Sequence, residues 1–293
     1  MILENNELKV TINSFGGELA SVVDKADGTE YIWQADPAFW GRHTPTLFPV
    51  VGKIKDGYFD YAGARYEMTS HGFFRDGETS LELTGENQVT ATLVANEFTK
   101  KMYPFDFVAK VVFTLVGRTV KVGYVVENPG SKDFPFSIGG HPAFNVPLEK
   151  GLAFEDYYFD FGEEQDVSHI PLDLKDGGTS DLKNAQDVRL NAKLPISHKV
   201  FQYDAMIFAT QGAQEIALKS DKGSKEVVVS YGADLNLVGL WSPYPKEAPF
   251  VCVEPWYGLA SDTDGNHDLF DKKAIQILSP GKVWNGGFEM EFK

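Results

Sequence analysis

Residues 107–128 read FVAKVVFTLVGRTVKVGYVVEN. The two arms of this stretch, Phe107–Val116 and Thr119–Asn128, are rich in β-branched and aromatic residues and flank the dipeptide Gly117-Arg118. In the second arm the apolar residues alternate with other residues, so they share one face of an extended chain. These residues are Val120, Val122, Tyr124 and Val126. The segment therefore predicts two antiparallel strands joined by a tight turn.

The same pattern recurs outward from this segment. Glu215–Leu218 and Glu226–Tyr231 bracket the polar stretch 220–224, and Ala274–Leu278 and Gly287–Phe292 bracket Ser279-Pro280-Gly281-Lys282, so each pair predicts a hairpin. Shorter strand-like runs occur at Leu8–Ile12, Leu19–Val23, Leu81–Leu83, Val89–Val94 and Phe250–Val253.

No window shows three turns of helical periodicity with caps. The polar stretch 171–197 is weakly patterned and predicts a surface excursion, because strong strands resume after it without a change in composition. Many short antiparallel strands with Gly, Pro and Asp in the turns predict an all-β fold, a large antiparallel β-sandwich. We expect one domain that spans residues 1–293.

Composition excludes several classes of protein. The 293 residues, 43% of them apolar, can bury a large core without disulfides or metals. The lone cysteine, Cys252, excludes an internal disulfide and a multi-cysteine metal site, and it fits a reducing compartment. No secretory signal or 18-residue apolar run is present. The net charge of −15 opposes binding to nucleic acid and to anionic membranes. The lone cysteine, the missing secretory signal and the acidic charge together lead us to expect a cytoplasmic protein.

Two segments place histidine or basic residues in irregular sequence. Residues 42–53, RHTPTLFPVVGK, combine basic residues with a proline-broken apolar run, which is typical of a loop beside a pocket and equally of an ordinary exposed connection. Residues 71–76, HGFFRD, set His71 before a glycine that allows a sharp turn, and Arg75 is near enough to pair with Asp76 or a ligand oxygen.

Two further segments hold candidate acid–base groups. In residues 139–144, GGHPAF, the glycines and the proline place His141 on stiff backbone, which suits a catalytic acid and also a core histidine. In residues 250–256, FVCVEPW, Glu254 ends an apolar strand, and burying an unpaired carboxylate is costly, so the group is either functional or paired. Trp256 offers a flat face to a sugar ring, and Asp204 raises the same question as Glu254 within another apolar strand.

Other motifs fail on spacing. Gly52-Lys53 lacks the upstream glycine of a phosphate-binding loop, and residues 262–266 place the glycine of a calcium loop wrongly. Ser137 near His141 has no nucleophile elbow, and the chain has no Cys/His cluster for zinc. Ordinary structural roles are expected for the remaining histidines, His43, His169, His198 and His267.

In this order along the chain, the segments around His71, His141, Asp204 and Glu254 resemble the aldose 1-epimerase family, and most closely its LacX-like branch, which shares traits with hexose-6-phosphate mutarotases. The resemblance covers almost the whole chain and implies a galactose mutarotase-like supersandwich that acts on a small sugar without a cofactor or metal. Self-association as a homodimer stays open.

The resemblance also implies a role for each residue. His141 matches the general acid and Glu254 the general base, His71 the second histidine at the substrate, and Asp204 the acid that holds sugar hydroxyls. Lys53 falls near the family's substrate-binding arginine and lacks its bidentate fork. The resemblance makes Arg75 the candidate for a compensating cation, because the His-Gly-aromatic-x-Arg pattern is typical of the phosphosugar-like branches. The Pro255-Trp256 pair after Glu254 departs from galactose mutarotases.

The expected reaction is the interconversion of α and β anomers, in which an ionised Glu254 takes the proton of the C1 hydroxyl and a protonated His141 gives one to the ring oxygen. Three other functions stay open. They are a sugar-binding or sensing protein without turnover, a sugar-phosphate epimerase with a cationic patch of Arg42, Lys53, Lys55 and Arg75, and a glycoside hydrolase or lyase that uses Glu254 with Asp204.

Overall fold

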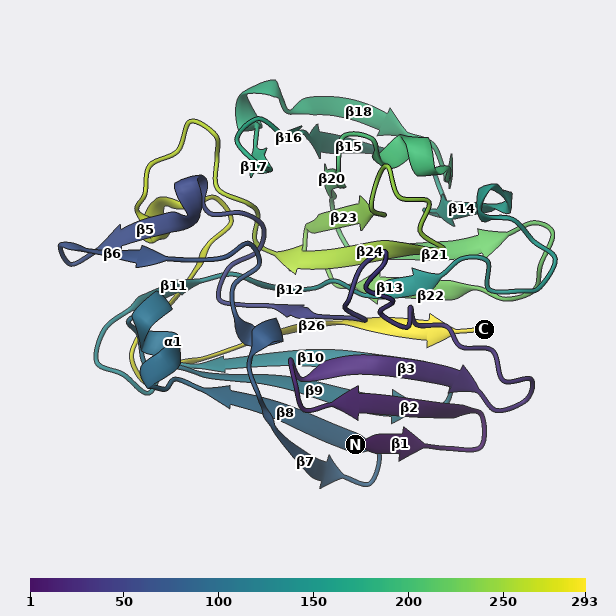
Figure 1. Cartoon of the computed structure of the whole chain (residues 1–293), viewed down its shortest axis with the longest axis horizontal. Helices are drawn as coiled ribbons and strands as arrows, with labels where there is room; N and C mark the ends of the chain where they lie inside the picture. Colours follow the sequence, from purple (N-terminus) through teal and green to yellow (C-terminus); the bar gives the residue numbers. More distant parts are fainter.

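Two large antiparallel sheets carry most of the strand residues in the computed structural model, which describes residues 1–293 (Figure 1). The all-β prediction is confirmed. The larger sheet has nine strands in the order β19 (Lys193–Pro195), β14 (Tyr157–Asp160), β21 (Gln214–Ser220), β22 (Val227–Tyr231), β26 (Val283–Phe292), β10 (Thr119–Glu127), β9 (Val108–Val116), β8 (Gln88–Val94) and β7 (Ser80–Gly85).

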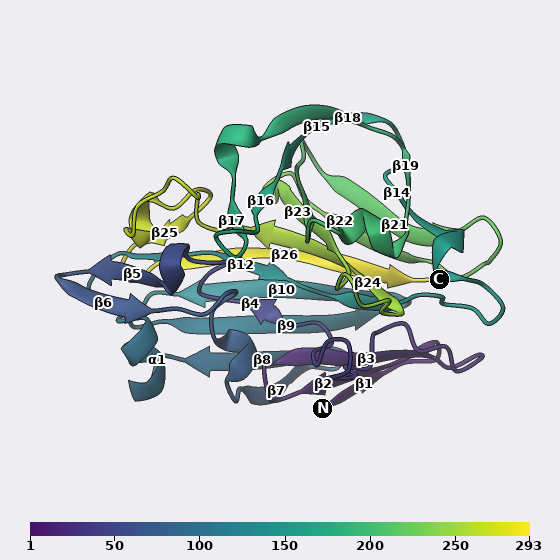
Figure 2. The same cartoon turned by 45° about the horizontal axis from the view of Figure 1, so that its top comes forward.

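The second sheet has eight strands. Its order is β18 (Gln186–Leu190), β15 (Gln165–Ile170), β20 (Met206–Ala209), β23 (Leu237–Trp241), β24 (Phe250–Tyr257), β12 (Ile138–Gly140) and β4 (Thr46–Leu47), and β13 (Ala143–Asn145) pairs with β24. In Figure 2 strands β15 and β18 of this sheet arch above the rest of the molecule.

Smaller units complete the fold. A three-stranded sheet of β1 (Ile2–Glu4), β2 (Leu8–Asn13) and β3 (Glu18–Asp24) lies alongside the β7–β10 end of the larger sheet in both views (Figures 1 and 2). Three two-stranded pairs are formed by β5 (Tyr58–Tyr61) with β6 (Ala64–Glu67), β11 (Phe134–Phe136) with β25 (Gln276–Leu278), and β16 (Leu172–Asp173) with β17 (Thr179–Ser180). None of the helices is long and apolar enough to cross a membrane.

The hairpin predictions are confirmed in two cases and wrong in the third. Strands β9 and β10 pair around Gly117-Arg118 with Val116 opposite Thr119, and β21 pairs with β22. The C-terminal segments do not form a hairpin with each other. Strand β25 pairs with β11, whereas β26 lies between β10 and β22, so both of its edges are already occupied.

Two local features go beyond what the sequence pattern predicted. A short helix, α1 (Glu97–Met102), begins at Asn96, whose side chain accepts hydrogen bonds from Phe98 and Thr99 backbone N–H groups. At six residues it is too short to show a helical period. The stretch 171–197 is more than an excursion, because it supplies the edge strands β18 and β19 and the buried strand β17.

Strand β24 separates two environments. All eight of its residues are buried. Val251 and Val253 belong to the main core of 60 buried residues, which the two large sheets share. Phe250, Cys252 and Trp256 instead belong to two smaller clusters on the opposite face. Because successive side chains alternate between faces, Glu254 points to this second face, away from the main core.

A buried carboxylate ties the N-terminal sheet to the turns of the nine-stranded sheet. The side chain of Asp24, at the end of β3, is only 4% exposed and accepts hydrogen bonds from Arg118 Nη2 at 2.7 Å and from Lys225 Nζ at 2.7 Å. Burial alone raises the pKa of Asp24, but the hydrogen bonds from Lys225 and Arg118 outweigh burial and hold this pKa well below its usual range.

Replacement of this carboxylate tests its contribution. Asp24→Asn is expected to lower the free energy of unfolding by about 3 kcal/mol near neutral pH, because it removes the buried carboxylate that two cations share. The native pKa lies below the unfolded value of about 3.9, so the contribution is fully present above that pH and is lost as the pH falls. In urea unfolding, the difference in the free energy of unfolding between wild type and Asp24→Asn should therefore become smaller below about pH 4.

The matched control is Asp27→Asn. Asp27 also contacts Lys225, at 2.8 Å, but its side chain is 49% exposed, so its loss should cost less than about 1 kcal/mol. An equal loss of unfolding free energy in the two variants, or a loss in Asp24→Asn that does not depend on pH, would contradict the assigned role of Asp24.

Candidate active site

One cavity of about 220 Å³ collects the residues that the resemblance assigned to catalysis or sugar binding, together with Trp256. We call it the His141 pocket. Its nominated lining residues are Lys53, His71, Arg75, His141, Asp204, Glu254 and Trp256. Two further indole rings, Trp40 and Trp241, also line the cavity and were not nominated. The pocket therefore combines charged, hydrogen-bonding and aromatic groups, as small-molecule sites do.

Glu254 and Trp256 reach the pocket because both lie on the outer face of β24. The sequence placed Glu254 at the end of a strand, but the strand continues to Tyr257, and Glu254 is 1% exposed in its middle. Beside it, Gly139 of β12 lies opposite Trp256, and a Cβ at Gly139 would meet the indole Cδ1 at 2.6 Å. Glycine at this position therefore leaves the space that the indole occupies.

His141 follows β12 and meets Glu254 directly. The His141 Nε2 and Glu254 Oε2 atoms are 3.2 Å apart, although the two groups are 113 positions apart in the sequence. The imidazole stacks on Trp40 with ring centroids 4.7 Å apart, and Trp241 meets it edge-on at 5.4 Å. These indoles restrict the ring to one orientation, in which a nitrogen faces the carboxylate.

Burial opposes charge on both groups. It raises the pKa of Glu254 well above its ordinary value, and the nearby charge of Asp204 raises it further. Burial also lowers the pKa of His141 well below its ordinary value, with help from His71 and Arg75. This differs from the sequence expectation of an ionised Glu254 beside a protonated His141, because that expectation took no account of desolvation.

His71 lies in a turn with φ +66°, an uncommon conformation for a residue with a Cβ. The Gly52 N–H donates to its Nδ1 at 3.2 Å, so the neutral ring carries its proton on Nε2. Burial, together with nearby cations of which Arg75 is the strongest, lowers the pKa of His71 to about 3. His71 is therefore a neutral ring at physiological pH, and its centroid lies 5.6 Å from that of His141.

The predicted cationic patch is only partly formed. Arg75 and Lys53 line the pocket, and Arg75 Nη2 donates to Ser70 O at 2.7 Å. Arg42 instead donates hydrogen bonds from Nη1 to the Arg75 carbonyl at 3.1 Å and from Nη2 to the Asp76 carboxylate at 2.7 Å. Lys55 is also outside the pocket, because its Nζ donates to the Thr263 and Gly265 carbonyls at 2.8 Å. The ammonium group of Lys55 thus binds carbonyl groups of residues 262–266, the loop whose sequence partly resembles a calcium-binding loop.

Asp204 lines the pocket but does not lie within a strand, so that detail of the prediction is wrong. It precedes β20 in a turn, with φ +71°. Asp tolerates the left-handed region better than most residues, which explains an acid at this position. Gly177 and Gly178 also line the pocket. They come from the weakly patterned stretch 171–197, where the sequence gave no signal for a site.

Four of the seven buried polar side-chain atoms without a hydrogen-bond partner belong to residues of this pocket. They are Arg75 Nε, His141 Nδ1, Glu254 Oε2 and Trp256 Nε1. Buried polar atoms are nearly always paired, so a concentration of unpaired ones marks a binding site. The set offers donors and acceptors to one ligand, which is the pattern that a polyhydroxylated molecule requires.

The remaining histidines lie elsewhere, as expected. His43 contacts Glu18 at 3.2 Å, His267 contacts Asp56 at 2.9 Å, and His198 stacks on Phe154. None of these, nor His169, lines the His141 pocket.

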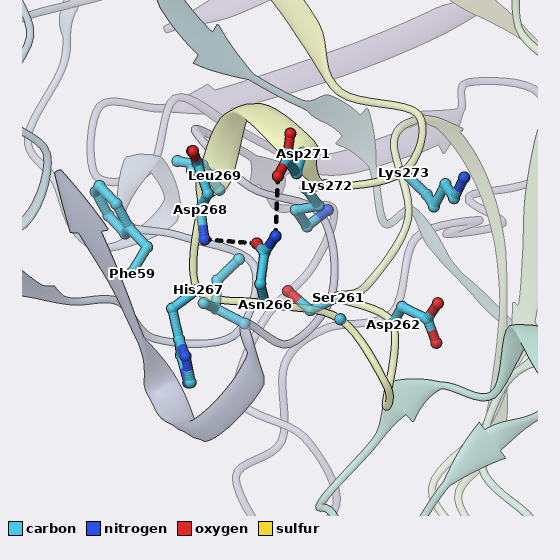
Figure 3. Close-up of a pocket in the computed structure, with 12 residues that line it drawn as sticks. Phe59, Ser261, Asp262, Asn266, His267, Asp268, Leu269, Asp271, Lys272 and Lys273 are labelled. Carbon is cyan, nitrogen blue, oxygen red and sulfur yellow. Dashed lines mark hydrogen bonds between the residues drawn. The ribbon is translucent and has the colours of Figure 1, made fainter.

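A second cavity lies behind one wall of the His141 pocket, and we call it the Lys272 pocket. Figure 3 shows its lining, in which Asn266 accepts from Asp268 N–H at 2.8 Å and donates to Asp271 at 2.9 Å. Lys272 is buried, and burial lowers its pKa to about 7. Its Nζ donates to the carbonyls of Val51 and Leu259, which precede the pocket-lining residues Gly52 and Ala260. Lys272 thus supports the wall that separates the two cavities.

Comparison with known proteins agrees with this geometry. A family model described as Aldose 1-epimerase matches residues 1–268. The plasmid-encoded LacX protein of Lactococcus lactis subsp. lactis is 34% identical over 285 residues, which are 95% of this chain and 94% of that protein.

Solved structures give the same result. The galactose mutarotase related enzyme from Lactobacillus acidophilus has a TM-score of 0.96 and 35% identity, with 100% of this chain and 97% of that chain covered. A galactose mutarotase-like protein from Lactobacillus casei has a TM-score of 0.90 and 30% identity, with 100% and 99% covered.

The fold is a galactose mutarotase-like β-sandwich, and its pocket is lined by charged, hydrogen-bonding and aromatic groups. The chain belongs to the aldose 1-epimerase family, and the predicted likeness to LacX is confirmed.

The turn at His71 allows a direct test of how the backbone places this ring. At Gly72, φ is +67° and an added Cβ would lie 2.3 Å from the Phe48 carbonyl oxygen. Gly72→Ala is therefore expected to cost roughly 3 kcal/mol or more in unfolding free energy, since backbone must move against backbone. Gly63→Ala is the control, because Gly63 has φ +80° but no atom within 4 Å of a new Cβ, and should cost about 1 kcal/mol. Similar costs in urea unfolding would show that the close contact at Gly72 does not matter.

Proposed function

We propose that the protein is an aldose 1-epimerase, an isomerase that interconverts the α and β anomers of a hexose. The observation that carries the proposal is the contact of 3.2 Å between His141 and Glu254 in a pocket where four buried polar side-chain atoms lack hydrogen-bond partners. Ring opening of a hemiacetal needs one proton acceptor and one proton donor at neighbouring oxygens of the sugar. A carboxyl and an imidazole side by side supply both.

In the proposed reaction Glu254 takes the proton of the C1 hydroxyl and His141 gives a proton to the ring oxygen. Rotation about the C1–C2 bond and reclosure with the roles reversed then give the other anomer. Both transfers move only protons, so the chemistry requires no metal, nucleotide or redox cofactor. Each group is expected to contribute roughly 10²–10⁴-fold to the rate.

The buried setting strengthens both groups for these roles. A carboxylate whose pKa is raised by burial is a stronger base, and an imidazolium whose pKa is lowered by burial is a stronger acid. Ring opening moves one proton to Glu254 and one away from His141, and reclosure returns both, so the pair holds the same number of protons before and after each turnover. Sugar hydroxyls and Arg75, whose charge already lowers the pKa of Glu254, favour the ionised carboxylate once substrate is bound.

The remaining pocket residues are assigned to substrate binding. Trp40, Trp241 and Trp256 offer flat apolar surfaces to the apolar face of a pyranose ring. His71, neutral and with its proton on Nε2, can donate to an oxygen near the reacting end, and Asp204 can accept from sugar hydroxyls. Arg75 and Lys53 supply the cationic donors.

Replacement of the paired groups tests the proposal. Glu254→Gln and His141→Asn are each expected to slow mutarotation by about 10²–10⁴-fold, because each removes one proton-transfer partner. Polarimetry on freshly dissolved α-glucose and α-galactose measures the rate, and thermal melting checks that each variant folds. His169→Asn, outside the pocket, is the control and should keep the wild-type rate. Folded variants with unchanged rates would remove the assignment, and calorimetric sugar binding without any rate enhancement would indicate a binding protein instead.

A hexose phosphate is a second candidate substrate, because Arg75 and Lys53 place two cations in one pocket of a protein with a net charge of −15. The buried Arg75 Nε has no partner, so a phosphate oxygen could accept from it. If the substrate is phosphorylated, Arg75→Ala should raise KM for a hexose 6-phosphate at least about 10-fold and change KM for the free hexose much less. A mutarotation panel of both sugar types decides this, and equal changes in KM would argue for the free sugar.

A further inference from the structure

Cys252 lies directly beside the acid–base pair and takes no part in the reaction proposed above. It precedes Glu254 by two positions in β24, so both side chains point to the same face of the strand. Its thiol is fully buried and forms no disulfide. An apolar residue of similar volume would suit this position in a cluster of apolar side chains, so packing alone does not require a thiol.

Three potential metal donors meet at this point, although they lie too far apart in the sequence for its spacing to predict a zinc site. The ligand atoms of His141, Cys252 and Glu254 all lie within 4.8 Å of one another, and the nearest nitrogen and oxygen are 3.2 Å apart. Zn²⁺ binds sulfur at about 2.3 Å and nitrogen or oxygen at about 2.0–2.2 Å, so donors around one ion stand roughly 3–4 Å apart. Small side-chain rotations would therefore bring all three to one ion.

We propose that His141, Cys252 and Glu254 bind a soft divalent cation, with Zn²⁺ as the best fit, and that this ion inhibits the enzyme. The binding part stands on the donor geometry, and the inhibition part rests on the proposed function. The thiolate and the carboxylate neutralise the charge of the ion, and the neutral imidazole completes a three-ligand set. The thiol proton and the carboxyl proton leave to solvent when the ion binds.

The fourth position of a tetrahedral ion would face the pocket, because His141 and Glu254 line it and Cys252 lies behind them. The ion must enter through the same opening as the sugar. Once bound, it occupies the lone pairs with which Glu254 and His141 exchange protons. Inhibition should therefore be competitive with the sugar.

The thiol determines which ions bind. Sulfur favours Zn²⁺ over Mg²⁺ and Ca²⁺, which prefer oxygen ligands. The guanidinium of Arg75 lines the same pocket and opposes any cation that is held by charge alone. The preference for Zn²⁺ over Mg²⁺ and Ca²⁺ should therefore be lost when Cys252 is replaced, even though His141 and Glu254 remain.

The experiment compares wild type with Cys252→Ala, and with Cys252→Val in case the smaller residue destabilises the cluster. In buffer without chelator, Zn²⁺ is expected to inhibit mutarotation by the wild type and Mg²⁺ is not. Either variant should keep the basal rate and need at least ~10-fold more Zn²⁺ for half-inhibition. His267→Gln removes an exposed histidine–carboxylate pair and should leave Zn²⁺ inhibition unchanged, which controls for adventitious surface binding.

Binding is also measured without turnover. Co²⁺ bound to wild type should show a thiolate charge-transfer absorption band, which Cys252→Ala lacks. If this band is present but no mutarotation is found, the metal site stands and the proposed function fails. Equal Zn²⁺ sensitivity of wild type and both Cys252 variants, or a Co²⁺ complex without the band, would overturn the metal site.

Discussion

A carboxylate in a strand with no exposed residue is the constraint around which the site is built. Strand β24 buries all eight of its residues, and an isolated ionised carboxylate there would cost far more than the fold can supply. Glu254 is accommodated because it points away from the main core and meets His141 at 3.2 Å. The acid–base character of the pair follows from this burial, since desolvation disfavours charge on both groups and so raises the pKa of Glu254 and lowers that of His141.

The wall around this pair is held mainly by backbone. The carbonyl of Val51 accepts from Lys272, and the next N–H along the chain, that of Gly52, donates to His71 Nδ1. One peptide unit therefore connects the buried ammonium of the Lys272 pocket to a ring of the His141 pocket. Because both ends of this peptide are bonded, His71 has a fixed tautomer and position that its own rotamer preferences would not provide.

The sequence predicted what depends on local pattern and missed what depends on pairing between distant strands. Period-2 alternation identified β9 and β10, because each residue there faces either core or solvent. The same alternation misjudged β25 and β26, since nothing local records that β26 pairs with β10 and β22 instead. Likewise, the residue types of His141 and Glu254 indicated chemistry, but their burial, which opposes the expected charges, is set by residues from other strands. The aromatic partners Trp40 and Trp241 carried no local signal at all.

The alternation of β24 also explains why a third donor accompanies the pair. Any side chain two positions before Glu254 must lie on the same face, and there it meets His141, which the paired strands β12 and β13 bring close. A group that holds a proton on a lone pair holds a metal ion with the same lone pair, so a site that is suited to proton exchange is already part of a ligand set. The sulfur of Cys252 completes this ligand set. With an apolar residue at this position, no metal ion would compete with protons for the lone pairs of His141 and Glu254. The identity of one buried residue thus decides whether the pocket responds to soft metal ions.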